Sequence, residues 1–422
     1  MTHNTPATIA APAHAQALFS PFEIRGKVTA PNRILKSALS EVLAKDGEHL
    51  PNEKHCRLYK RWAEGGTGIL VTGNVMIDRR ALGEPGNVVL EDDRHLDRFV
   101  AWADAVRAGN PNTQFWMQIN HPGKQTPKFL TPNPVAPSAV PLGKGLDKVF
   151  AVPRELQAQE IQDIIQRYAT TSRLAKEAGW DGVQIHGAHG YLVSQFLSPH
   201  HNRREDQWGG STENRRRFAL EVYRAIRAQV GDDFVISIKM NSADFQKGGF
   251  EGEEAYGLID ALSKEGIDHI EISGGNYENP AMTGAKQSTL KREAYFLDFA
   301  AEARKRTEVP IAVTGGFRSV AAMESAVSSG ATDFVGLGRA LTLDPELPQN
   351  AAQSPNYTCD VGRPTTGVKA LDQVFMLAVT YYETQISRMA QGLDPDPKMS
   401  AWKTVFGLAK THGKAAFKKR RA

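Results

Sequence analysis

Eight short apolar segments recur along the chain, and a stretch with helical periodicity follows each of them. The segments are rich in Val, Ile and other apolar residues, as is typical of strands buried on both faces of a parallel sheet. Eight strand–helix units in sequence predict a (β/α)8 barrel. A doubly wound open sheet is the alternative, but no Gly-x-Gly-x-x-Gly motif follows the first expected strand. The expected strands are residues 33–40, 68–75, 114–121, 182–189, 234–241, 269–275, 310–316 and 334–340.

The segments between the expected strands carry apolar stripes and signals for helix ends. In residues 158–178 and 212–230, apolar residues recur at spacings of three and four, which gives each helix one face to cover the sheet. Ser211 and Ser319 stand where two long helices should begin, and serine is a favoured N-cap. Glycine adopts the left-handed C-cap conformation at little cost. Glycines close several helices just before the next strand: Gly66, Gly109, Gly179, Gly231, Gly266 and Gly330.

The chain divides around the expected barrel. Residues 17–350 should form it, preceded by a loose arm at 1–16 and followed by a helical extension at 351–422 that ends in a basic tail. Residues 19–32 predict a short hairpin that closes the bottom of the barrel. Residues 122–157, rich in Pro and Gly, follow the third strand, and a long loop there is expected to act as a lid or a substrate-binding loop.

Composition and charge exclude several classes of protein. Five of the 51 basic residues lie in the last nine residues, which leaves 46 basic against 47 acidic residues elsewhere, so no broad basic face for nucleic acid is expected. The two cysteines, Cys56 and Cys359, are too few for a disulfide framework, a four-cysteine zinc site or an all-cysteine iron–sulfur cluster. No apolar run approaches roughly 18 residues, and no secretory signal is visible, so we expect a cytoplasmic protein without a membrane span.

The end of the fourth expected strand carries the sharpest chemical signal. Residues 182–191 read GVQIHGAHGY, and the carboxyl ends of barrel strands face the active site. His186 and His189 can direct two N–H groups at one oxygen and stabilise negative charge there. Tyr191 stays protonated at neutral pH and can act as a general acid. A metal site and a purely structural role for the histidines stay open; two more histidines follow at positions 200 and 201, but no carboxylate stands among them.

The ends of the later strands suit an anionic cofactor. Lys239 lies in an apolar strand and must face something polar, because burying a bare charge is costly. Either a ligand or a salt bridge to Glu271 would satisfy it. Glycines and an arginine close the seventh and eighth strands, where barrels frequently build a phosphate site. This phosphate-site candidate consists of Gly315, Gly316, Gly338 and Arg339.

Neutral polar groups close the first three expected strands. They suit a flat heteroaromatic ring with several carbonyl and N–H edges, because amide and hydroxyl groups both donate and accept hydrogen bonds. With a phosphate site and a cation nearby, they predict a seat for flavin mononucleotide (FMN). These groups are Ser37, Ser40, Gly73, Asn74, Gln118 and His121.

The sequence resembles a known enzyme family. Residues 185–218, IHGAHGYLVSQFLSPHHNRREDQWGGSTENRRRF, closely resemble the signature of the old yellow enzyme family, and the resemblance extends over residues 17–350. It implies a (β/α)8 barrel that binds FMN non-covalently and takes hydride from NADPH or NADH. The implied second substrate is a small alkene conjugated to a carbonyl or nitro group. Nicotinamide and alkene alternate over the flavin, which accounts for the missing dinucleotide motif.

The resemblance also implies roles for individual residues. His186 and His189 would hold the carbonyl oxygen of the substrate, and Tyr191 would give a proton to its α-carbon. The flavin-binding residues would be Gln118 at the pyrimidine edge, Lys239 beside N1 and O2, Ser37, Ala38 and Gly73 near the ring, and Gly315, Gly316, Gly338 and Arg339 at the phosphate.

Two positions depart from the family pattern. Ser40 falls where many relatives place Cys or Thr near flavin N5 and O4; a serine can donate a hydrogen bond there but lacks the chemistry of a thiol. Lys239 stands where arginine is common, so a point charge replaces a planar fork.

Other functions stay open on the sequence alone. The alternative is a flavin barrel that oxidises or demethylates a small substrate, although the paired histidines favour an anionic oxygen over an amine. A tRNA dihydrouridine synthase is a remote alternative, because the body of the chain is nearly neutral and no cysteine lies near an expected strand end. Members of the family are often homodimers or homotetramers, and we expect the same here.

Overall fold

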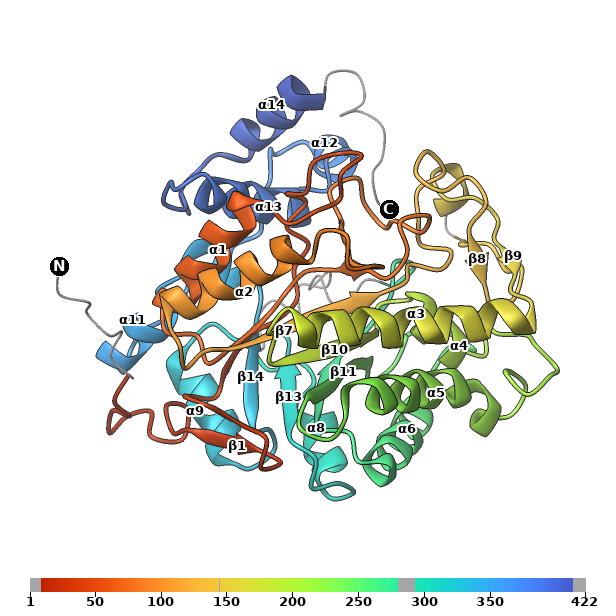
Figure 1. The fold of residues 1–422 in the computed structure, drawn as a ribbon. Helices are drawn as coiled ribbons and strands as arrows, with labels where there is room; N and C mark the ends of the chain where they lie inside the picture. Colours follow the sequence, from red (N-terminus) through yellow and green to blue (C-terminus); the bar gives the residue numbers. More distant parts are fainter. Residues whose placement is uncertain (1–8, 144, 280–292, 413–422) are drawn as a thin grey trace.

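The computed structural model describes residues 9–143, 145–279 and 293–412. Eight parallel strands form a closed barrel, because β10 pairs with β11 on one side and with β7 on the other. The predicted (β/α)8 barrel is confirmed, with each strand shorter than or equal to its expected segment (Figure 1). The strands are β3 (Ile34–Lys36), β4 (Ile69–Val71), β7 (Gln114–Asn120), β10 (Gly182–Gly187), β11 (Val235–Asn241), β12 (His269–Ser273), β13 (Ile311–Thr314) and β14 (Phe334–Leu337).

Helices pack outside this barrel, one or more after each strand. Strand residues are buried on both faces because one face fills the barrel and the other contacts the helices. Two short strands, β5 (Val75–Met76) and β6 (Val88–Val89), extend the sheet beside β7. The helices are α1 (Glu53–Glu64), α2 (Leu96–Gly109), α3 (Ala158–Glu177), α4 (Leu192–Leu197), α5 (Thr212–Val230), α6 (Gly252–Glu265), α8 (Leu297–Arg304), α9 (Val320–Ser328) and α10 (Arg339–Leu343).

The helix ends follow the expected capping residues with one exception. The Ser211 and Ser319 side chains accept hydrogen bonds from the amides of the third residue beyond them, which confirms both N-caps. Five of the six expected C-cap glycines have positive φ. Gly109 is the exception, because it is the last residue of α2 and does not have positive φ. A Cβ there would lie 2.5 Å from the carbonyl oxygen of Lys60, so its small size serves the packing of α2 against α1.

The amino-terminal segment closes the lower end of the barrel, as expected. Strands β1 (Phe22–Ile24) and β2 (Val28–Ala30) pair as an antiparallel hairpin at the bottom of the view (Figure 1). Ile24 is fully buried against the interior residues of the barrel, among them Trp116. Residues 9–16 are not loose where the structure describes them, because Ala15 is fully buried and the His14 ring bonds the carbonyl oxygen of Ala351 at 3.0 Å.

The loop at 122–157 is partly ordered by its own small elements. It contains β8 (Val135–Ala136), a single 3₁₀ turn (Leu146–Lys148) and β9 (Arg154–Glu155), and β8 pairs with β9. Leu142 and Phe150 pack against Tyr277, which follows β12. Within its described residues the loop does not line the main pocket, but Pro127 and Phe129 line a smaller pocket that shares Val379 with it.

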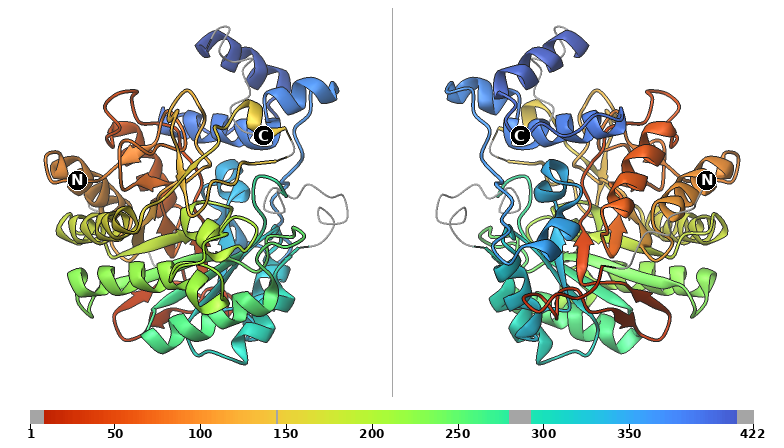
Figure 2. Two further views of the ribbon diagram at one scale, coloured as in Figure 1. Left: turned by 90° about the vertical axis from the view of Figure 1, so that its right-hand side faces the viewer. Right: turned by 90° about the vertical axis from the view of Figure 1, so that its left-hand side faces the viewer.

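The carboxyl-terminal extension is helical, as expected, and packs on its own chain. It consists of α11 (Leu347–Gln353), α12 (Lys369–Val374), α13 (Leu377–Ala390) and α14 (Ala401–His412). Helix α13 contacts α1 and α10, and α12, α13 and α14 lie over the end of the barrel opposite the hairpin (Figures 1 and 2). The expected basic tail, from Lys414 onward, lies outside the described residues. Among the helices that the structure describes, none is long and apolar enough to cross a lipid bilayer.

Candidate active site

A large pocket opens at the carboxyl ends of the barrel strands. It gathers thirteen of the fifteen residues expected at the site, from strands that are far apart in sequence. The thirteen are Ser37, Ala38, Ser40, Asn74, Gln118, His186, His189, Tyr191, Lys239, Gly315, Gly316, Gly338 and Arg339.

Two expected site residues, Gly73 and His121, do not line the pocket. The His121 ring is buried, and its Nδ1 accepts from the Gly123 amide at 3.0 Å. The Gly73 amide donates to the Glu41 carboxylate at 2.8 Å and to the Tyr59 hydroxyl at 3.2 Å. A Cβ at this position would lie 2.2 Å from Glu41 Oε2, so the glycine allows a buried carboxylate to approach the chain. The next residue, Asn74, lines the pocket instead.

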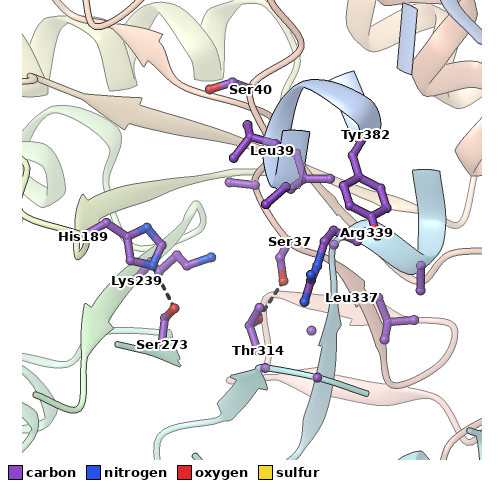
Figure 3. A pocket seen from close by; sticks show the side chains of 18 of the residues that line it. Ser37, Leu39, Ser40, His189, Lys239, Ser273, Thr314, Leu337, Arg339 and Tyr382 are labelled. Carbon is purple, nitrogen blue, oxygen red and sulfur yellow. Dashed lines mark hydrogen bonds between the residues drawn. The ribbon is translucent and has the colours of Figure 1, made fainter. Parts of the chain in front are cut away.

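His186 lies in β10 and His189 just after it, and the planes of their rings are nearly perpendicular in the pocket wall. Their ring centroids are 5.3 Å apart. His186 Nδ1 accepts a hydrogen bond from the Ala188 amide, which leaves the ring proton on Nε2. His189 has a φ of 60° and is fixed by Ser273, whose hydroxyl lies 2.8 Å from Nε2 (Figure 3).

Both imidazoles are neutral at pH 7. Burial, together with the neighbouring charges of His189 and Lys239, lowers the pKa of His186 well below its usual value. Burial and the Lys239 charge likewise lower the pKa of His189 to about 3, against the opposing effect of Glu271. A neutral imidazole can still donate one N–H to an anionic oxygen.

Tyr191 lies beside these histidines and is buried. Its ring centroid is 4.7 Å from that of His186, and its hydroxyl is 2.8 Å from the hydroxyl of Tyr277. Burial raises the pKa of Tyr191, although hydrogen bonds with Tyr277 and Asn74 partly oppose the shift. The phenol is therefore fully protonated at neutral pH.

Lys239 both forms the expected salt bridge with Glu271 and lies where it can face a ligand. Its ammonium lies 2.8 Å from Glu271 Oε1, and its side chain also lines the pocket. Burial alone would raise the pKa of Glu271, but Lys239 and the hydrogen bonds from Thr314 and Gln184 outweigh it and lower the pKa to about 2. The Gln118 amide joins this network by donating to Gln184 at 2.8 Å.

Glycines and cations meet at the other end of the pocket. Gly316 has a φ of 84°, and a Cβ on Gly336 would lie 1.8 Å from Thr314 Oγ1, so neither position accepts a side chain without strain. Arg339 points into the pocket with the Tyr382 ring beside it at 5.7 Å (Figure 3). No carboxylate in the described part of the chain pairs with the Arg339 guanidinium, which leaves its charge for an anionic ligand.

These groups fit FMN. Two cations, backbone amides at glycines that a Cβ would obstruct, and the Gln118 amide match a phosphate and a ring with carbonyl and N–H edges. The Ser40 hydroxyl donates to the Glu84 carboxylate at 3.1 Å and accepts from the Asn74 amide at 3.4 Å.

Several pocket residues were missed by reasoning from the sequence. Tyr277 follows β12. Arg318 lies two residues after Gly316, and its position near the expected phosphate site was the available signal. The wall formed by α13 had no such signal. Its pocket-lining residues are Ala378, Val379, Tyr382, Glu383 and Ile386, preceded by Met376.

One group of side chains capable of binding a metal lies apart from the expected ligands. His200, His201 and Glu278 bring their ligand atoms within 4.8 Å of one another. His201 Nδ1 already lies 2.8 Å from the buried ammonium of Lys124, whose charge opposes a cation. His186 and His189 belong to no such group among the described residues.

Comparisons with known proteins agree with this geometry. The sequence pattern of the NADH:flavin oxidoreductase / NADH oxidase family matches residues 17–357. The chain belongs to this family. The old yellow enzyme resemblance is confirmed, and the protein is an FMN-dependent oxidoreductase that uses NAD(P)H.

One relative and two solved structures illustrate the similarity. The NADH-dependent flavin oxidoreductase iliE of Hypocrea jecorina (strain QM6a) is 38% identical over 355 residues, which cover 78% of this chain and 87% of the relative. The structure of 2-naphthoyl-CoA reductase with 2-naphthoyl-CoA has a TM-score of 0.78 and 27% identity; the match covers 90% of this chain but 58% of that protein. The old yellow enzyme homologue of Zymomonas mobilis has a TM-score of 0.68 and 25% identity, over 82% of this chain and 94% of that one.

Proposed function

We propose that this flavin oxidoreductase reduces the C=C bond of small alkenes conjugated to a carbonyl or nitro group. The observation that carries the proposal is the wall of neutral His186 and His189 with protonated Tyr191, in the same pocket as the expected FMN-binding residues. Such a wall suits an oxygen that becomes negative next to a carbon that must be protonated.

The cofactor would lie across the floor of the pocket. Bound FMN supplies hydride at its N5 after receiving it from NAD(P)H. Lys239 stabilises the negative charge of the reduced ring, and Gln118 binds the pyrimidine edge. The remaining roles are those of Ser37, Ala38 and Ser40 near the ring and of Gly315, Gly316, Gly338 and Arg339 at the phosphate.

The histidines hold the oxygen of the substrate. His186 donates from Nε2, since its Nδ1 accepts from the backbone. As hydride reaches the β-carbon, negative charge develops on this oxygen, and a fixed donor of this kind is worth about 3 kcal/mol of barrier. Because both rings are neutral, they stabilise the anion without giving up a proton to it.

Tyr191 delivers the proton to the α-carbon. Its raised pKa keeps the proton in place until the carbanion character has developed. The solved relative bound to 2-naphthoyl-CoA supports this substrate class, because that ligand carries a carbonyl conjugated to unsaturated carbon.

An anaerobic visible spectrum tests the proposal. The flavin band of the holoenzyme should bleach with NAD(P)H and return on adding 2-cyclohexenone. In Tyr191→Phe, bleaching should keep its rate while recovery slows about 10²-fold or more, because the proton donor is lost. Tyr223→Phe is the matched control, since this buried tyrosine bonds the Glu265 carbonyl outside the pocket.

Three outcomes would overturn the proposal. The first is a flavin band that bleaches but does not return with any activated alkene. The second is a flavin reduced by an N-methylated amine in place of NAD(P)H. Equal slowing of both steps in Tyr191→Phe would remove the donor role from that residue.

A further inference from the structure

Tyr277 is a second phenol directly joined to the expected proton donor. It follows β12, and its hydroxyl lies 2.8 Å from that of Tyr191, with the rings edge to face at 5.9 Å between centroids. Both residues line the pocket. Tyr191 is 5% exposed, whereas Tyr277 is partly exposed, so the pair leads from the buried site toward solvent.

The loop that carries Tyr277 is held on both sides of the residue. The Asn276 side chain accepts from the Glu278 amide at 3.0 Å and from the Asn279 amide at 2.9 Å. Glu278 in turn accepts from the Gly143 amide at 2.9 Å. A bridge between Asn276 and His189 ties this loop to the turn that ends at Tyr191. The two hydroxyls are therefore positioned by the backbone, not by a chance side-chain contact.

The proposed reaction creates a need that this pair can meet. Each turnover removes a proton from Tyr191 and leaves a phenolate in a buried site. A buried phenolate is costly, and direct access of water to a residue that is 5% exposed is restricted. The next turnover requires the proton to be restored.

We propose that Tyr277 acts through Tyr191, as a positioning residue that returns a proton to the Tyr191 hydroxyl after each turnover. The inference rests on the proposed function, because it assumes that Tyr191 protonates the α-carbon. Among the described residues, Tyr277 is the residue whose hydroxyl is hydrogen-bonded to the hydroxyl of Tyr191.

The proton balance is simple. The Tyr191 O–H bond breaks and a C–H bond forms at the α-carbon of the substrate, which leaves a Tyr191 phenolate. The Tyr277 O–H bond then breaks and the Tyr191 O–H bond re-forms. Water protonates the Tyr277 phenolate and leaves hydroxide, which the buffer neutralises. No electron moves in these steps, since the hydride has already been transferred.

Burial and neighbouring charge in the pocket keep the Tyr277 hydroxyl protonated. Burial, the contact with Tyr191 and the charge of Glu383 all raise the pKa of Tyr277 well above its usual value. Glu383 belongs to α13 and lines the same pocket. Tyr277 is therefore protonated at neutral pH.

Counting turnovers tests the relay. Reduced holoenzyme is mixed with 2-cyclohexenone for one turnover, and with excess NAD(P)H and enone for many, while the ultraviolet band of tyrosine phenolate is followed. In Tyr277→Phe the first reoxidation should stay within about two-fold of the unmodified protein, but later turnovers should slow about 10-fold or more. In this variant the ultraviolet band of the Tyr191 phenolate should appear after the first turnover. Tyr223→Phe should match the unmodified protein throughout.

The other outcomes overturn the relay. Later turnovers as fast as the first, or an absent phenolate signal, would show that Tyr191 recovers its proton elsewhere. Equal slowing of first and later turnovers would indicate a purely structural role. Tyr277→Leu repeats the test without a ring, and loss of FMN in both variants would equally contradict the proposal. If the unmodified flavin is not reoxidised by any activated alkene, the proposed function fails first.

Discussion

Lys239 and Glu271 show how one residue can serve both the fold and the site. Their ion pair is almost fully buried, and two more side chains, Gln184 and Thr314, donate hydrogen bonds to the carboxylate. Removing one partner of a buried pair costs more than the pair contributes, because the other charge is left uncompensated. The pair therefore fixes a positive charge beside the ring site.

The pair predicts a stability that depends on pH. Glu271 has a folded pKa of about 2 against an ordinary value of 4.5, so its contribution is present above 4.5 and is lost as the pH falls toward 2. Glu271→Gln should lower the free energy of unfolding at pH 7 by about 3 kcal/mol and weaken its decline in acid. Urea denaturation at several pH values measures both effects.

The control for this prediction is a carboxylate on the surface. Glu302→Gln removes an exposed partner of Lys305 and should change the free energy of unfolding by less than about 1 kcal/mol. A Glu271→Gln protein with unaltered stability and an unaltered acid profile would show that Lys239 does not depend on this carboxylate.

Helix α13 gives the carboxyl-terminal extension a place in the site. Its apolar residues pack on α1 and α10, and its first turns form one wall of the pocket. Met376, just before the helix, has a φ of 47°, a conformation that L-residues seldom adopt, and it turns the chain into this wall. Val379 lines both the main pocket and a smaller one beside it. We therefore expect α13 to limit the size of the substrate.

A bulky residue at Val379 should select against large substrates. In Val379→Trp, the Kd of a polycyclic enone should rise about 10-fold, while that of 2-cyclohexenone changes less than about three-fold, because a tryptophan narrows the mouth of the pocket. Ligand-induced changes in the flavin band give both constants. Ser387→Trp, on the same helix but outside the pocket lining, should leave both unchanged. Equal changes for both enones would remove α13 from substrate selection.

At the scale of the whole molecule, the two ends of the barrel have different roles. The hairpin of β1 and β2 closes one end of the barrel (Figure 2) and contributes apolar side chains to its interior. The pocket with the candidate catalytic groups opens at the other end. In barrels of this kind, the end with the amino termini of the strands serves stability and the other end serves chemistry.

This division predicts that stability and activity can be changed separately. Ile24→Ala removes a fully buried side chain from the closed end and should lower the free energy of unfolding by about 2–4 kcal/mol. Flavin reduction by NAD(P)H at 25 °C should stay within about two-fold, since folded protein still dominates. Thr29→Ala, exposed in the same hairpin, should cost less than about 0.5 kcal/mol. A large loss of reduction rate in folded Ile24→Ala would contradict the separation.

The sequence by itself determined the barrel and most of the site. Strands buried on both faces must be apolar throughout, so eight such runs separated by amphipathic helices predict the closed sheet. The barrel then places whatever follows each strand at one mouth, which is how His186, Lys239 and Arg339 were assigned to a single site.

Only the tertiary structure decided which partners these residues have. Tyr277 meets Tyr191 across 86 positions of sequence, and α13 reaches the pocket from outside the strand–helix repeat. Gly73 does not line the pocket, and its amide donates to the buried carboxylate of Glu41. Local patterns report which face of an element is buried, but the distance between two side chains on different elements depends on how the whole chain packs.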